Sequence, residues 1–175
     1  MRTDIVFTLT GTDRIGIVEE VTGVLLALDS NVHTSRMVRL GGEFALLMLV
    51  SLPDDRATEL EAAIAALAAD GYSITVGPAA RPETDRSEWR PYQVSVLGAD
   101  HEGIIHEIAQ GLSRGGINIE SMDTSTAEAP VTGAPLFSMS ALVLVPPHLS
   151  EEEWIGVLAE AGDQANVDIE VSAAP

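Results

Sequence analysis

A stretch near the start of the chain occurs again in its second half and decides the fold. "TLTGTDRIGIVEEVTGVLLALDSNV" (residues 8–32) aligns without a gap with "SVLGADHEGIIHEIAQGLSRGGINI" (residues 95–119), 87 positions later. Both copies contain the pattern Gly-x-Asp-x-x-Gly-Ile, then apolar residues at helical spacing, and then an asparagine. A repeat of this length indicates that one structural unit is duplicated within the chain.

The alignment continues downstream with a longer second copy. The offset becomes 93, where Phe44 aligns with Phe137 and "SITV" (residues 73–76) with "NVDI" (residues 166–169). The six extra residues fall around "AEAPVTGAP" (residues 127–135), whose two prolines and glycine predict a loop.

Each copy is predicted to fold as strand, helix, strand, strand, helix, strand. Alternating residues predict the first strand, and apolar residues at helical spacing predict the helix that follows. Gly41 and Gly42 lie between two strand-like runs and are typical of a hairpin turn, while Gly71 is predicted to end the second helix. The first copy has predicted elements at residues 4–11, from about 14, 31–40, 43–52, 56–71 and 72–77, and the second at 92–98, 102–114, 117–127, 135–145, 151–162 and 166–172.

This order predicts an α+β protein with two ferredoxin-like βαββαβ domains in tandem. With right-handed crossovers, each domain forms a four-stranded antiparallel sheet with two helices on one face. We place the first domain at residues 1–79 and the second at 91–175, joined by a charged, proline-containing linker at 80–90. Sheet edges would remain exposed unless the domains dock on each other or on a second chain.

Composition excludes several classes of function. The 175 residues include 27 acidic and 9 basic side chains, and a formal net charge of −18 opposes direct binding to nucleic acid. Any effect on transcription would therefore act through another protein, although the acidic excess also fits a simple role in solubility. The absence of cysteine excludes disulfides and cysteine nucleophiles. The longest apolar run, residues 44–50, is too short to span a membrane, so we expect a soluble cytoplasmic protein.

The histidines of the second copy do not predict a metal site. His101 and His106 are five residues apart, which places them about 140° apart around a helix, whereas a zinc-binding helix needs them four apart. No nucleophile, base or metal-ligand cluster occurs in both copies. We therefore expect no metal, no cofactor and no enzymatic activity.

The repeated motif resembles the ACT domain, a small regulatory module that commonly binds amino acids. The resemblance rests on residues 11–18 and 98–105 with the later pairs 31–32 and 118–119, although the ACT pattern often has proline where this chain has Ile15 and Glu102. Two such units with a short linker resemble the glycine cleavage system transcriptional repressor family. That resemblance implies a small amino acid as effector, glycine among the candidates, a DNA-binding regulator as protein partner, and a homodimer.

The residues of the motif suit an amino-acid ligand. The repeated aspartate is expected to cap the first helix, and the repeated glycine leaves the helix N-terminus open to a carboxylate. The repeated asparagine is expected beside the same loop, where its amide could contact the ammonium or the carboxylate. Aspartate caps, turn glycines and asparagines also occur for folding alone. The predicted ligand-binding residues are Asp13, Gly16, Ile17, Asn31 and Val32, with Asp100, Gly103, Ile104, Asn118 and Ile119.

The favoured function is a non-catalytic regulatory protein that senses an amino acid and changes its contact with a partner. The alternative is a ligand-independent interaction module that regulates a metabolic enzyme. The two tryptophans could mark an interface, but Trp154 lies on the apolar face of its helix and is expected in the core.

Overall fold

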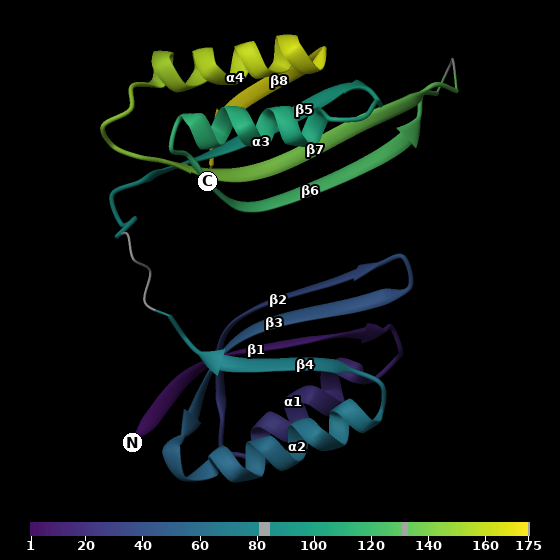
Figure 1. Cartoon of the computed structure of the whole chain (residues 1–175), viewed down its shortest axis with the longest axis vertical. Coiled ribbons are helices and arrows are strands. Elements are labelled where there is room, and N and C mark those ends of the chain that lie inside the picture. The colour runs from purple at the N-terminus through teal and green to yellow at the C-terminus, as the bar shows by residue number, and fades with distance from the viewer. Residues whose placement is uncertain (81–84, 131–132, 175) are drawn as a thin grey trace. The chain divides into compact units, whose positions relative to one another are not determined.

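The computed structural model describes residues 1–80, 85–130 and 133–174. The chain divides into two compact units, Met1–Pro82 (unit 1) and Glu83–Pro175 (unit 2). In each unit, two helices cover one face of a sheet (Figure 1). No helix in the described part of the chain is long and apolar enough to cross a membrane.

The predicted element order is confirmed in both units. Each sheet has four strands, in the orders β2-β3-β1-β4 and β6-β7-β5-β8, and neighbouring strands are antiparallel. The fold is therefore α+β, with two ferredoxin-like units. Unit 1 contains β1 (Arg2–Thr12), α1 (Ile17–Ala27), β2 (Asn31–Leu40), β3 (Glu43–Pro53), the 3-10 helix η1 (Asp54–Arg56), α2 (Ala57–Ala69) and β4 (Ser73–Pro78). Unit 2 contains β5 (Arg90–Ala99), α3 (Ile104–Arg114), β6 (Asn118–Glu128), β7 (Pro135–Val145), α4 (Glu151–Ala165) and β8 (Val167–Ala173).

Glycines set several of the boundaries between elements. Gly41 and Gly42 have φ angles of 59° and 89°, as a two-residue hairpin turn with the right-handed strand twist requires. Gly71 follows α2 with φ 94°, which confirms it as the helix stop. The first helix of each unit begins later than predicted, at Ile17 and Ile104, because the preceding glycine adopts a left-handed conformation that a helix cannot continue through.

The sheet register tests the alignment of the two copies. Phe44 lies opposite Gly11, and Phe137 lies opposite Gly98, which confirms the offset of 93 at β3 and β7.

The predicted alignment of the last strands is wrong. Ile74 lies opposite Leu9, and Ile169 lies opposite Val96, the residue equivalent to Leu9. Residues 73–76 therefore correspond to 168–171 rather than 166–169. The observed offset between the last strands is two residues larger than the predicted one, because α4 has 15 residues and α2 has 13.

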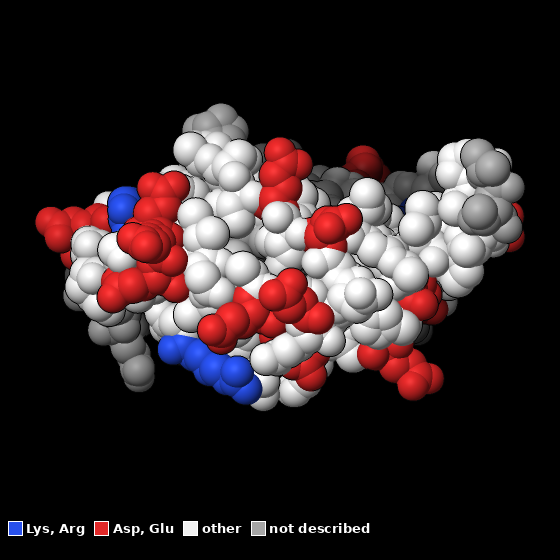
Figure 2. All heavy atoms as spheres, turned by 90° about the horizontal axis from the view of Figure 1, so that it is seen from above, with Lys and Arg blue, Asp and Glu red and all other residues white. Residues whose placement is uncertain are grey.

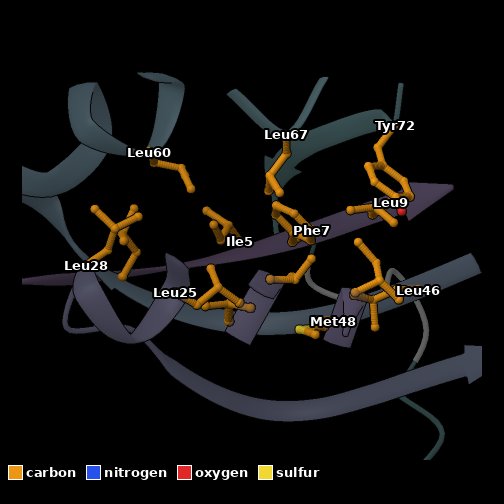
Figure 3. Close-up of a cluster of buried hydrophobic side chains, with 14 of the residues drawn as sticks. Ile5, Phe7, Leu9, Leu25, Leu28, Leu46, Met48, Leu60, Leu67 and Tyr72 are labelled. Carbon is orange, nitrogen blue, oxygen red and sulfur yellow. The ribbon is translucent and has the colours of Figure 1, made fainter. Parts of the chain in front are cut away.

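Each unit has its own apolar core between its helices and its sheet. In unit 1, side chains from α1, α2 and β1 meet over the inner face of the sheet (Figure 3). In unit 2, Trp154 of α4 is completely buried, and its ring centroid lies 4.8 Å from that of Tyr92. The prediction that Trp154 belongs to the core is confirmed.

The segments predicted as connections are described only in part. Residues 81–84 of the predicted linker and residues 131–132 of the predicted loop lie outside the described residues. Within the linker, the Arg86 guanidinium lies 5.4 Å from the centroid of the half-buried Trp89 ring. Beside residues 131–132, Gly133 has φ 69° and donates its N–H to the carbonyl of Ala129 at 2.9 Å, as in a turn between β6 and β7.

Candidate functional site

The repeated motif forms the loop between the first strand and the first helix of each unit. We call residues 12–16 loop 1 and residues 99–103 loop 2. Gly16 and Gly103 are the N-cap residues of α1 and α3, with φ angles of 93° and 97°, and no side chain caps either helix. A Cβ added at either glycine would meet no atom within 4 Å. The first N–H groups of both helices therefore lack the side-chain acceptor that a capping residue supplies.

The expectation that the repeated aspartates cap these helices is wrong. Asp13 precedes Gly16 by three residues and instead connects its loop to the hairpin, donating its N–H to Gly42 O at 2.9 Å. Its carboxylate accepts from Arg39 Nε at 2.6 Å. Asp100 donates its N–H to the carbonyl of Pro135 at 3.0 Å. The glycine takes the cap position because its left-handed conformation inserts a turn between the aspartate and the helix.

The charged side chains of loop 1 are paired within their own unit. Arg14 forms an ion pair with Glu20, and its guanidinium lies 5.5 Å from the centroid of the Tyr72 ring. Gly11 provides the space for that ring, because a Cβ there would lie 2.5 Å from Tyr72 Cδ1. Together with the Arg39 pair, these contacts leave both cations near loop 1 already matched with carboxylates.

Loop 2 borders an open cleft of about 770 Å³. Its walls come from loop 2 itself, from α3, from Phe137 of β7 and from β6, where Thr124 and Thr126 supply hydroxyl groups, while the Ser125 hydroxyl bonds that of Ser138 on the other face. Asp100 lines the cleft and forms no ion pair with any residue that the structure describes. The difference from loop 1 follows from the sequence, because the position of Arg39 opposite Phe44 is taken by Thr126 opposite Phe137.

His101, the equivalent of Arg14, is held by two backbone carbonyls. Its Nε2 lies 2.7 Å from the oxygen of Ala165, and its Nδ1 lies 3.0 Å from the oxygen of Glu102. A neutral imidazole has only one N–H, so only the imidazolium can donate to both acceptors. The carbonyl of Glu102 and then that of Ala165 raise the pKa of His101 above its ordinary value of 6.5. His101 is thus exposed to solvent and also anchored by the backbone.

His106 lines the same cleft from α3. Within residues 1–80, 85–130 and 133–174, no group of three or more histidine, cysteine, aspartate or glutamate side chains could hold a metal ion.

The expectation that the asparagines lie beside these loops is wrong for a single unit. Asn31 pairs with Ser51, which lies opposite Asp4 at the start of β1, whereas loop 1 begins at Thr12. Eight residues of strand at about 3.3 Å each separate the two ends by about 26 Å. Asn118 is placed in the same way at the start of β6, opposite Leu144. The first helix carries the chain back along the sheet, so the second strand starts at the far end.

The apolar residues of the motif belong mainly to the cores. Ile17 and Ile104 are both 2% exposed, so their side chains pack inward and only their backbone N–H groups face the loops. Val32 is 37% exposed, and Ile119 is half-buried against the core of unit 2. Sequence reasoning missed the hydroxyl groups of Thr124 and Thr126, although "DTSTA" in a predicted strand beside the loop was a usable signal.

Comparisons with known proteins agree with this architecture. The ACT-domain family profile matches residues 3–75. The crystal structure of an unknown protein from Galdieria sulphuraria is 31% identical to this chain, with 100% of both chains covered and a TM-score of 0.87. The crystal structure of a protein named "putative glycine cleavage system transcriptional repressor" is 21% identical, with 98% of this chain and 97% of that chain covered and a TM-score of 0.70. No curated protein sequence matches this chain.

Residues 3–75 therefore match the ACT-domain family, and unit 2 repeats the topology of unit 1. The predicted resemblance to the repressor family is confirmed at the level of fold.

Proposed function

We propose that this protein is a non-catalytic regulator that binds a small amino acid in the cleft at loop 2. The observation that carries the proposal is the difference between the two loops. The Asp13 carboxylate of loop 1 is bonded to Arg39, whereas Asp100 lines the cleft at loop 2 beside uncapped helix N–H groups and has only an electrostatic interaction with the neighbouring His101. A free amino acid carries one negative and one positive group and so needs both.

The cleft offers a partner for each end of such a ligand. The N–H groups that follow Gly103 and the positive end of the α3 dipole favour a carboxylate, and the His101 imidazolium adds positive charge nearby. The Asp100 carboxylate suits an ammonium group, and the hydroxyls of Thr124 and Thr126 can accept or donate.

A second unit is needed to enclose a small ligand, because the cleft is open and much larger than glycine. Two copies of the chain packed antiparallel would bring the start of the second strand of one copy, with its asparagine, to the loop of the other. We therefore propose a homodimer in which the asparagines complete the site, and binding at that junction would favour one packing of the two copies over another.

The partner is proposed to be a protein, such as a DNA-binding regulator. Acidic side chains outnumber basic ones over the face seen in Figure 2, and the net charge of −18 opposes contact with phosphates. The alternative is a ligand-independent module that controls a metabolic enzyme. It is supported by the fact that the residue types of the motif also occur for folding alone.

Calorimetry with glycine, alanine and serine tests the proposal on the full chain. We expect binding in the wild type, at least a tenfold loss in Gly103→Leu, and retention in Gly16→Leu. The two substitutions are matched, because both glycines have positive φ and open space around the missing Cβ. Absence of heat with all three amino acids would favour the alternative, and loss of binding in Gly16→Leu alone would place the site at loop 1.

A further inference from the structure

A second cavity lies in unit 1, on the side of its sheet that the helices cover. This groove of about 500 Å³ runs between α2 and the edge of the sheet, and we call it the α2 groove. Leu60 and Ile64 of α2 form one wall, and Ile5 of β1 with Val76 of β4 forms the other. Figure 3 shows Leu60 pointing from α2 toward Ile5. The walls are apolar and the volume is in the range of a small-molecule site.

In unit 2, aromatic rings fill the equivalent space. Leu60 is the fourth residue of α2, and Trp154 is the fourth residue of α4. Ile5 corresponds to Tyr92 by the repeat of 87 residues. Trp154 is completely buried, and its ring lies against Tyr92 at 57°. The same fold therefore holds an indole ring in unit 2 at the place where unit 1 has a groove.

The helices of unit 1 also pack differently from those of unit 2. In unit 2, a Cβ added at Gly111 would lie 3.0 Å from the Cβ of Ala161, so α3 and α4 pack closely. The equivalent residues of unit 1 are Val24 and Leu67, and α1 and α2 approach each other less closely than α3 and α4 do. Val24 and Leu67 are larger than the glycine and the alanine at the equivalent positions of unit 2, and Leu60 is shorter than the Trp154 indole.

The rim of the groove is acidic. Asp54 and Glu61 both line it, and Asp54 Oδ1 accepts a hydrogen bond from Thr3 Oγ1 at 2.8 Å. Neither carboxylate forms an ion pair with a residue in the described parts of the chain. Arg56, the basic residue between them in sequence, is bound to Glu59. The rim thus presents negative charge beside an apolar space.

We propose that the α2 groove binds a small aromatic amine, with its ring against Leu60 and Ile5 and its ammonium at Asp54 and Glu61. The ring would take the place that the Trp154 indole takes in unit 2. The charge requirement comes from the two rim carboxylates, which would repel an aromatic acid. This site is separate from loop 2, so the chain would respond to a second ligand whether or not loop 2 binds an amino acid.

Tryptamine is the probe, titrated into the ¹⁵N-labelled full chain and followed by NMR. We expect saturable shifts at the amides of Leu60, Ile64 and Val76, and nuclear Overhauser contacts from the indole protons to the Leu60 methyl groups. Indole-3-acetate, with the same ring and the opposite charge, should bind at least tenfold more weakly, and isobutylamine should not bind. Equal affinity for tryptamine and indole-3-acetate would overturn the proposal, as would shifts confined to other residues.

Leu60→Trp tests whether the α2 groove corresponds to the position of the Trp154 indole, because it gives unit 1 the side chain that unit 2 has there. We expect tryptamine affinity to fall at least tenfold, with the far-ultraviolet circular dichroism unchanged. Leu47→Trp is the matched control, since Leu47 is 48% exposed on the opposite face of the same sheet, and it should bind like the wild type.

Two further variants separate the contribution of the aromatic ring from that of the ammonium charge, and the α2 groove from the cleft at loop 2. Glu61→Gln should weaken tryptamine severalfold while leaving the weak binding of neutral indole unchanged. Gly103→Leu should leave tryptamine binding intact. If Leu60→Trp does not fold, the Overhauser contacts in the wild type decide the matter. Binding of a tryptophan-containing peptide without any binding of tryptamine would make the groove a protein-docking site and refute the proposal.

Discussion

Replacement of Trp154 by alanine tests how unit 2 is held together. The side chain is completely buried, and a tryptophan buries about 150–250 Å². At about 25 cal/mol per Å² this corresponds to about 4–6 kcal/mol, close to the 3–5 kcal/mol typical of large aromatic truncations. We therefore expect Trp154→Ala to lower the free energy of unfolding of unit 2 by about 4 kcal/mol.

The indole N–H makes a sharper test possible. Trp154 Nε1 is buried and has no hydrogen-bond partner in the structure, and an unsatisfied buried donor costs about 1–3 kcal/mol. Trp154→Phe removes that donor while keeping one aromatic ring against Tyr92. The loss of ring area and the relief of the unpaired donor oppose each other, so we expect a net cost below about 1.5 kcal/mol.

Urea denaturation followed by circular dichroism measures both variants, and hydrogen exchange of unit 2 amides assigns the change to that unit. Leu60→Ala serves as the matched variant at the fourth residue of α2, with an expected cost of about 2–3 kcal/mol in unit 1. Equal destabilisation by Trp154→Phe and Trp154→Ala would show that the indole N–H is bonded in solution, and the reasoning about the unpaired donor would be wrong.

Three other predictions concern local contacts. The partners of His101 raise its pKa, so the imidazolium stabilises the fold fully below pH 6.5, and this stabilisation is lost as pH rises through the pKa of the folded state. The melting temperature should therefore fall over that pH range in the wild type. His101→Asn should abolish this pH dependence, whereas the control His106→Asn should keep it. Ser150→Ala breaks the capping box with Glu153 and should cost about 0.5–2 kcal/mol in thermal unfolding. The same bonds lower the pKa of Glu153, so this contribution should fade as pH falls through that pKa, which a melting series in acid would reveal. Gly111→Leu should cost about 1–3 kcal/mol by forcing α3 and α4 apart, whereas Gly23→Leu, where a Cβ meets nothing within 4 Å, should cost little in the same denaturation assay.

Local chemistry allowed much of the fold to be predicted. Residues that alternate or recur at helical spacing report which face is buried, and this information lies within a few positions of each residue. Gly41, Gly42 and Gly71 adopt the positive φ angles that their positions predicted. The one alignment error, at β8, arose because two residues were added within α4, where a helix can lengthen without leaving a sequence signal.

The candidate site was predicted less well. The sequence marked the correct loops but assigned the cap to Asp13 and Asp100, because a capping aspartate and a left-handed glycine three residues later look alike in the motif. It also placed Asn31 and Asn118 beside the loops. Their true position follows from the direction of the first helix and the strand register, which are set by pairing with residues far away in the chain.

The sequence by itself therefore determined the duplication, the order of strands and helices, the cores and the family resemblance, because these follow from short-range periodicity repeated in two copies. Only the tertiary structure decided how the charges of each loop are matched. In loop 1, Asp13 pairs with Arg39 and Arg14 lies against Tyr72, and these partners from β2 and the segment after α2 reach the loop only when the sheet forms. The α2 groove likewise joins residues of α2, β1 and β4, which lie far apart in the sequence and meet only in the folded unit.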